Sequence, residues 1–225
     1  MSLDKMIAIA VPDAPWALEG IFTGASGVEP GGAVVAAPHP LYGGSMDSPV
    51  VAELAWACQS AGYATVRFNW RGVGASGGEV NGEPALADAD YAAALAYLEE
   101  TAPGPILAAG YSFGAATAVR VARRSPRVRR LVLVAPPPAL LDSDALAGIR
   151  GSALIVVGSR DSFAPTDELA RLLGESDRRS KSRAVRRSRT ESIRMEVIPG
   201  ADHFFATGLA DISRLARAWL DEGRL

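Results

Sequence analysis

Short apolar runs alternate along the chain with longer segments in which apolar residues recur at helical spacing. Patterns typical of strands lie at residues 33–37, 64–70, 106–109, 131–135, 152–157 and 194–198. Patterns typical of helices lie at residues 50–61, 85–100, 113–123, 165–173 and 208–220. Strands that alternate with helices in this way predict an α/β fold, with a mostly parallel sheet and helices on both faces.

The N-terminal segments depart from this alternation. Residues 6–11 and 17–22 lie close together with no helix between them, which predicts an antiparallel pair at one edge of the sheet. No repeat or linker divides residues 1–225, so we expect one domain. Ligands of such sheets bind beyond the carboxyl ends of the strands, and chemistry is therefore expected in the loops that follow them.

The composition is that of a globular protein, with 48% hydrophobic and 21% charged residues among 225. The single cysteine, Cys58, cannot form an internal disulfide. No apolar run approaches the roughly 20 residues of a membrane span, and the run at 6–11 is too short for a signal peptide. These features predict a cytoplasmic protein without a membrane partner, and they indicate no oligomeric state.

One segment is strongly basic. Residues 178–190 contain seven of the 23 lysines and arginines and no acidic residue. Such a run can bind nucleic acid or anionic lipid. It contains no aromatic residue to stack on bases, and its apolar content is limited to Ala184 and Val185. We expect a solvated, mobile insertion without a specific nucleic-acid partner.

The loop after the predicted strand at 106–109 reads Gly110-Tyr111-Ser112-Phe113-Gly114. A serine in a G-x-S-x-G pattern between a strand and a helix is typical of a nucleophile held in a sharp turn. The glycines let strand and helix approach closely, and the helix N-terminus favours negative charge near the serine. Ser112 is the candidate nucleophile.

A serine nucleophile needs a base, and the base needs a carboxylate to orient it. The chain has two histidines, His39 and His203, each in the loop after a predicted strand. Asp161 also follows a strand. Ser112, Asp161 and His203 are therefore the candidate triad, while His39 is expected to brace its own loop.

These motifs resemble those of the α/β-hydrolases, whose triad runs in the order Ser, Asp, His. The resemblance covers nearly the whole chain. The segments at 38–44 and 67–77, PHPLYGG and RFNWRGVGASG, are similar to a group of small bacterial α/β-hydrolases of poorly defined substrate. Two features depart from that group: Ala37 stands where a histidine is common, and the basic segment is additional.

Such a hydrolase also needs two backbone N–H groups to stabilise an oxyanion. One is expected from Phe113, directly after the nucleophile. The other is expected from the loop after residues 33–37, at Leu41 or alternatively Tyr42, because Pro40 has no N–H. The apolar walls of the site are expected from aromatic residues near these loops: Tyr42, Trp70, Tyr111, Phe163, Phe204 and Phe205.

Many α/β-hydrolases carry a lid where this chain has only residues 136–151, so we expect no cap domain and an open cleft. The resemblance implies a serine hydrolase that cleaves an ester or thioester of a small acyl substrate. A peptidase or acyltransferase on the same fold, or a binding module without activity, remains an alternative. The glycine-rich loop from Arg71 lacks the lysine of a phosphate loop, and the few histidines and cysteines are widely spaced, so neither cofactor nor metal is expected.

Overall fold

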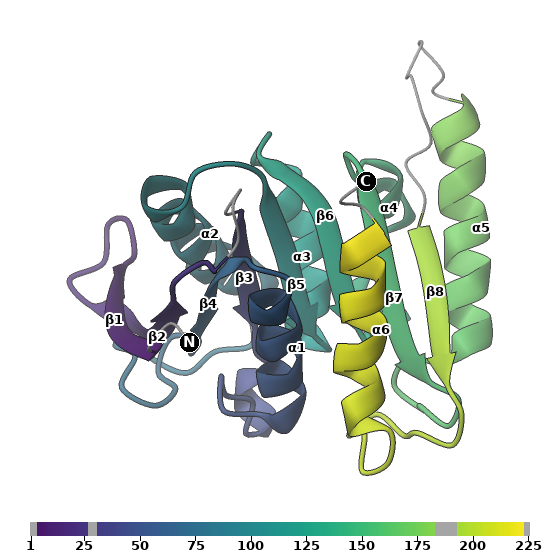
Figure 1. The fold of residues 1–225 in the computed structure, drawn as a ribbon, viewed down its shortest axis with the longest axis horizontal. Helices are drawn as coiled ribbons and strands as arrows, with labels where there is room; N and C mark the ends of the chain where they lie inside the picture. The colour runs from purple at the N-terminus through teal and green to yellow at the C-terminus, as the bar shows by residue number, and fades with distance from the viewer. Residues whose placement is uncertain (1–3, 27–30, 183–192, 223–225) are drawn as a thin grey trace.

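A single sheet runs through the computed structural model, which describes residues 4–26, 31–182 and 193–222 (Figure 1). The strand order is β1-β2-β4-β3-β5-β6-β7-β8. The strands are β1 (Asp4–Ala10), β2 (Ala17–Thr23), β3 (Gly32–Ala36), β4 (Ala64–Phe68), β5 (Ile106–Tyr111), β6 (Val128–Val134), β7 (Ser152–Gly158) and β8 (Ile193–Ile198).

The directions of the strands agree with the sequence prediction. β1 pairs with β2 and β2 pairs with β4 in antiparallel fashion, and the other neighbours in the sheet are parallel. The mostly parallel sheet with an antiparallel N-terminal edge is thereby confirmed. The carboxyl ends of the parallel strands lie together at the lower edge of the sheet in Figure 1.

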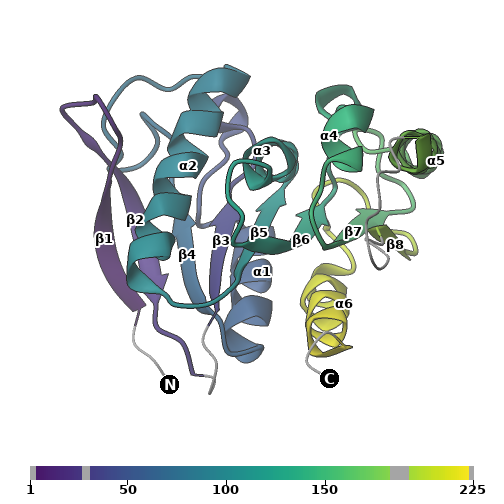
Figure 2. The same cartoon turned by 90° about the horizontal axis from the view of Figure 1, so that it is seen from above.

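Helices cover both faces of the sheet (Figure 2). Helices α1 (Pro49–Ser60) and α6 (Leu209–Glu222) pack together on one face. The other face carries α2 (Pro84–Thr101), α3 (Phe113–Ala122), α4 (Ser143–Ala147) and α5 (Thr166–Ser182). Proline occupies the first turn of α1 and of α2, where its missing N–H costs no helical hydrogen bond.

This double cover explains why the central strands read as continuous apolar runs. Every residue of β3 and β5 is buried. A strand covered on both faces has no solvent-facing side and therefore no alternation of polar and apolar residues. Cys58, in α1, is also fully buried, and burial raises the pKa of its thiol to about 12.

Helix α5 is longer than the sequence predicted. It begins at Thr166 and ends at Ser182, beyond the expected end at residue 173. The backbone of residues 178–182, the start of the basic segment, is therefore helical rather than part of a loop. The remainder of that segment, residues 183–190, lies outside the described residues.

Between β6 and β7 the chain forms only a short turn of helix, η2 (Pro138–Leu140), and the one-turn helix α4. No cap domain is inserted at this position, as expected from the short spacing. No helix in the described part of the chain combines the length and apolar composition needed to cross a membrane.

Candidate active site

The candidate nucleophile lies in a strained turn between β5 and α3. Ser112 has φ 53° and ψ −116°, a backbone conformation that residues other than glycine rarely adopt. A Cβ added at Gly110 would lie 2.4 Å from the carbonyl carbon of Gly114, and one added at Gly114 would lie 2.4 Å from the carbonyl oxygen of Ala37. Both glycines are therefore required for the close approach that places Ser112 at the end of the sheet.

The base and the carboxylate come from the loops after β8 and β7. The Nε2 atom of His203 lies 3.0 Å from the Oγ atom of Ser112. The Nδ1 atom of His203 lies 2.8 Å from Oδ2 and 3.0 Å from Oδ1 of Asp161. All three side chains are buried. The structure therefore brings the three predicted residues together in one continuous chain of polar contacts.

The loop that carries Asp161 fixes the orientation of its carboxylate. Oδ1 of Asp161 accepts hydrogen bonds from the backbone N–H groups of Phe163 at 2.9 Å and Ala164 at 2.8 Å. Oδ2 is left to face His203. With a carboxylate at Nδ1, the histidine carries its proton on that nitrogen and presents Nε2 as an acceptor toward the serine hydroxyl.

The loop that carries His203 is held at several points. Arg160 donates its N–H to the carbonyl of Ala201, and Gly200 donates its N–H to the hydroxyl of Ser159. Within the loop, the carboxylate of Asp202 accepts from the N–H groups of Phe204 and Ala206. The bonds of Arg160 and Ser159 tie the loop to the one that carries Asp161, and those of Asp202 brace it internally.

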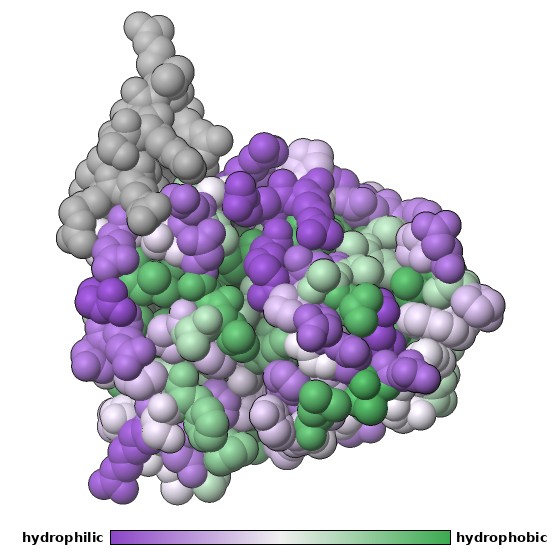
Figure 3. All heavy atoms as spheres, turned by 180° about the vertical axis from the view of Figure 1, so that it is seen from behind, coloured by the Kyte–Doolittle hydropathy of each residue, from purple (hydrophilic) through white to green (hydrophobic). Residues whose placement is uncertain are grey.

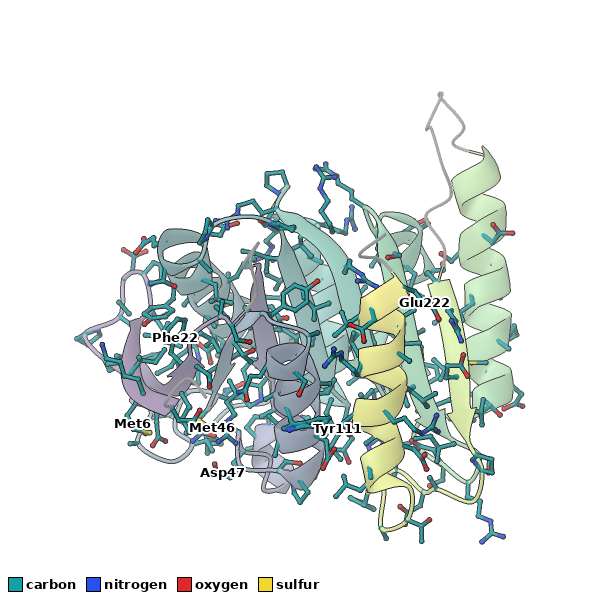
Figure 4. All side chains as sticks on the ribbon, viewed as in Figure 1. Met6, Phe22, Met46, Asp47, Tyr111 and Glu222 are labelled. Atoms are coloured by element: carbon teal, nitrogen blue, oxygen red, sulfur yellow. The ribbon has the colours of Figure 1, made fainter. Side chains whose placement is uncertain are left out.

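Tyr111, the residue before the nucleophile, also contacts this loop. Its hydroxyl donates a 2.8 Å hydrogen bond to the backbone carbonyl of His203. Burial raises the pKa of the Tyr111 phenol, and the carboxylates of Asp161 and Asp202 raise it further. The phenol is therefore protonated, as a donor must be. Figure 4 labels Tyr111 near the lower ends of the strands.

The backbone N–H groups near Ser112 differ in their availability. Phe113 is the first residue of α3, and the first N–H groups of a helix have no partner within it. In the loop after β3, the N–H of Leu41 donates to Nδ1 of His39 at 3.2 Å, and the N–H of Tyr42 donates to the carbonyl of His39 at 3.1 Å. The two groups favoured by the sequence are therefore engaged within their own turn.

His39 offers a further backbone N–H group, which the sequence pattern did not indicate as a donor to the oxyanion. No hydrogen bond among the described residues uses its N–H, and the next residue, Pro40, has none to offer. Its ring packs 4.7 Å from that of Phe113. Burial lowers the pKa of His39, which agrees with a neutral ring whose Nδ1 accepts from Leu41.

The aromatic residues expected around the site fall into two groups. Tyr42, Phe163 and Phe204 are 87%, 58% and 68% exposed, and the ring of Phe163 lies 4.8 Å from that of His203. Leu41 is also exposed. In Figure 3, drawn from behind, apolar residues are exposed along the lower edge, where the strands end.

The second group lies beneath the surface, which differs from the role expected for it. Trp70, Tyr111 and Phe205 are buried. The Nε1 atom of Trp70 donates to the carbonyls of Ala37 and Pro38, so this side chain supports the loop after β3 and offers no surface to a substrate. The sequence identified these residues by their place in the chain, but their orientation depends on packing.

The glycine-rich loop after β4 also proves to be a structural element. The guanidinium of Arg71 forms a 2.7 Å ion pair with Asp90 of α2, which is almost fully buried. The backbone N–H of Arg71 donates to the same carboxylate, and the guanidinium lies over the ring of Trp16. Arg71 is therefore occupied within the fold, as expected for a supporting loop. Within the described residues, no three histidine, cysteine or acidic side chains are grouped to hold a metal ion.

Comparison with known proteins agrees with this geometry. A family model for the alpha/beta hydrolase fold matches residues 40–172. An uncharacterised protein of Rickettsia prowazekii is 31% identical over 209 residues, which cover 90% of this chain and 84% of that protein. An alpha-beta serine hydrolase homologue from Coxiella burnetii is 30% identical with a TM-score of 0.80, over 98% of both chains. A protein of unknown function from Agrobacterium tumefaciens is 28% identical with a TM-score of 0.81, over 99% of this chain and 98% of that one. The chain belongs to the alpha/beta hydrolase family.

Proposed function

We propose that this protein is a serine hydrolase that cleaves a carboxylic ester or thioester through an acyl-enzyme intermediate. The observation that carries the proposal is the unbroken chain of contacts from Ser112 through His203 to Asp161, at 3.0 Å and 2.8 Å. These are hydrogen-bond distances between a nucleophile, its base and the group that orients the base.

In the first half of the reaction, Nε2 of His203 takes the proton of Ser112 while Oγ attacks the substrate carbonyl carbon. Asp161 stabilises the imidazolium that forms. The tetrahedral intermediate collapses, the bond to the alcohol or thiol breaks, and His203 returns the proton to that leaving group. In the second half, His203 activates a water molecule that attacks the acyl-serine, and the acid is released.

The oxyanion of each intermediate needs donors that are already in place. We assign the first to the N–H of Phe113, at the N-terminus of α3. For the second we favour the N–H of His39 over that of Leu41, because the Leu41 N–H would first have to leave Nδ1 of His39. Removal of one such donor lowers kcat by about 10²–10³-fold in other serine hydrolases.

The exposed apolar side chains next to the site support an apolar substrate. Phe163 and Phe204 flank His203, while Leu41 and Tyr42 extend from the loop on which His39 lies. Burial of apolar surface contributes about 25 cal/mol per Å², so an apolar acyl or alcohol group gains affinity there. An ester with an uncharged, apolar acyl group is the substrate class that this rim favours.

A panel of p-nitrophenyl esters, acyl thioesters and peptides tests the reaction class. We expect turnover of the esters and thioesters, with negligible cleavage of peptides, and no turnover by Ser112→Ala. Peptide cleavage at a higher kcat/KM than ester cleavage would identify a peptidase. Faster product formation with an added alcohol, with transfer of the acyl group to it, would identify an acyltransferase.

A further inference from the structure

The hydroxyl of Tyr111 links the two loops that carry the proposed nucleophile and base. Tyr111 is the last residue of β5 and directly precedes Ser112. Its hydroxyl oxygen lies 2.8 Å from the carbonyl oxygen of His203, 92 residues away in the sequence. The ring of Tyr111 lies 5.6 Å from that of His203 and 6.2 Å from that of Phe205. Both ends of this link are buried.

The Tyr111 hydrogen bond differs from the other bonds to the loop that carries His203 in the residue that it reaches. In the described part of the chain, the loop after β7 binds the backbone of the His203 loop at Gly200 and Ala201, and its Asp161 binds His203 only at the imidazole. The bonds of the Asp202 carboxylate remain within the loop. The Tyr111 hydroxyl instead holds the backbone at His203 itself.

The strand end from which Tyr111 extends is held to β6 by backbone hydrogen bonds. The backbone of Tyr111 pairs with Val134 of β6, and the N–H of Ser112 donates to the carbonyl of Val134 at 2.8 Å. Ser112 and the tyrosine that holds His203 are thus adjacent residues fixed to the same neighbouring strand. A displacement of the His203 backbone relative to Ser112 would require the hydrogen bond between the Tyr111 hydroxyl and the His203 carbonyl to stretch or break.

We propose that Tyr111 is a positioning residue, whose hydroxyl holds His203 at the distance from Ser112 and Asp161 that proton transfer requires. The proposal rests on the proposed function, because it assigns His203 the role of base. It removes Tyr111 from the substrate contacts and predicts that its hydroxyl affects kcat rather than substrate binding. Small displacements of catalytic groups are known to lower rates by about 10²-fold.

The test is Tyr111→Phe, which removes one oxygen atom and keeps the ring. Tyr91→Phe is the matched control: Tyr91 is also buried, and its hydroxyl lies 3.2 Å from the carbonyl of Ala109 and 3.4 Å from that of Val34, away from the histidine. Both variants lose a buried hydrogen bond and are compared at equal folded fraction, measured by circular dichroism. For Tyr111→Phe we expect kcat to fall roughly 10–100-fold with KM within threefold. For Tyr91→Phe both constants should stay within threefold.

Proton NMR of protein labelled with 15N-histidine gives a readout that does not depend on a substrate. The chain has only two histidines, so the ring signals of His203 and His39 are separable. We expect the proton on Nδ1 of His203, which faces Asp161, to shift or broaden in Tyr111→Phe and to remain unchanged in Tyr91→Phe. A merely structural role for the hydroxyl would not produce this difference.

The outcomes separate the two proposals. If the parent protein fails to react with a fluorophosphonate at Ser112, the proposed function is rejected, whatever the variants do. If the parent reacts and Tyr111→Phe retains both its kcat and the Nδ1 proton signal, the positioning role alone is rejected. An equal loss of kcat in Tyr111→Phe and Tyr91→Phe would also reject it, because the effect would then be one of general destabilisation.

Discussion

Replacing Asp161 by asparagine tests how the proposed base is oriented, and the structure allows its consequence to be worked out atom by atom. Oδ1 of Asp161 accepts the N–H groups of Phe163 and Ala164. An asparagine retains an oxygen there, since both donors require an acceptor. Its amide nitrogen must then occupy the position of Oδ2, which lies 2.8 Å from Nδ1 of His203.

The amide NH₂ in this position can only donate. The retained oxygen lies farther from Nδ1 of His203, at 3.0 Å, and already accepts two backbone N–H groups, so we expect Nδ1 to become the acceptor of the amide NH₂. The histidine then carries its proton on Nε2 and donates it to Ser112, which leaves no acceptor for the serine proton. The same tautomer change in a serine protease triad lowers kcat by about 10⁴-fold. At about 1.4 kcal/mol per factor of ten, this is about 5 kcal/mol of lost transition-state stabilisation.

The assay is steady-state hydrolysis of a p-nitrophenyl ester together with thermal denaturation. We expect Asp161→Asn to lower kcat by about 10⁴-fold while the fold is retained, because the backbone donors of the loop keep their acceptor. The matched control is Asp202→Asn, which changes the neighbouring carboxylate. That carboxylate binds backbone N–H groups and not the imidazole, so kcat should stay within a few-fold. A loss of less than tenfold in Asp161→Asn, or equal losses in the two variants, would refute this account of the orientation of His203.

The remaining predictions concern groups around the site. Asp90→Ala leaves the Arg71 guanidinium without its carboxylate partner and should lower the free energy of unfolding by about 3–5 kcal/mol in urea denaturation. In the control Asp211→Ala, loss of the exposed ion pair with Arg214 should lower it by at most about 1 kcal/mol. His39→Pro should have a kcat about 10²–10³-fold below that of His39→Ala, because proline fits its φ of −63° but lacks the N–H; equal values would favour Leu41 as the donor. Because burial lowers the pKa of His39, the unfolded chain binds a proton there more readily. The contribution of His39 to the free energy of unfolding should therefore be fully present above the unfolded pKa of about 6.5 and should be lost as the pH falls below it. In pH-dependent denaturation, His39→Asn should lack this pH-dependent contribution.

The order of strands and helices could be predicted from the sequence because buried positions are occupied by apolar residues, in patterns that differ between strands and helices. β3 and β5 are covered on both faces and read as apolar runs, and α6 presents an apolar stripe to the core. The end of α5 could not be predicted in this way. Residues 174–182 are polar apart from Gly174, so no periodic burial marks the helix beyond residue 173. β6 begins at Val128 and not at residue 131 as predicted, for a related reason: Arg130 lies in the strand, and its guanidinium donates to the distant carbonyls of Trp219 and Leu220.

The candidate triad could be predicted because its members need particular side chains in particular loops. Few residues can act as a base, and only two histidines were available. The groups around the triad depend instead on orientation, which the sequence does not record. Trp70 and Tyr111 occupy the expected loops, but their polar atoms bind backbone carbonyls and their rings are buried. The use of the Leu41 N–H depends on a ring nitrogen of His39, and therefore on a rotamer.

The most direct test of the central claim is to treat the protein with a fluorophosphonate and to locate the modified residue by mass spectrometry of its peptides. The account predicts one equivalent of label on Ser112, with loss of ester turnover in proportion to labelling. Labelling should be at least 10³-fold slower in His203→Ala, since the base that activates the serine is then missing. Label on another serine, or full reactivity of Ser112 without His203, would contradict it.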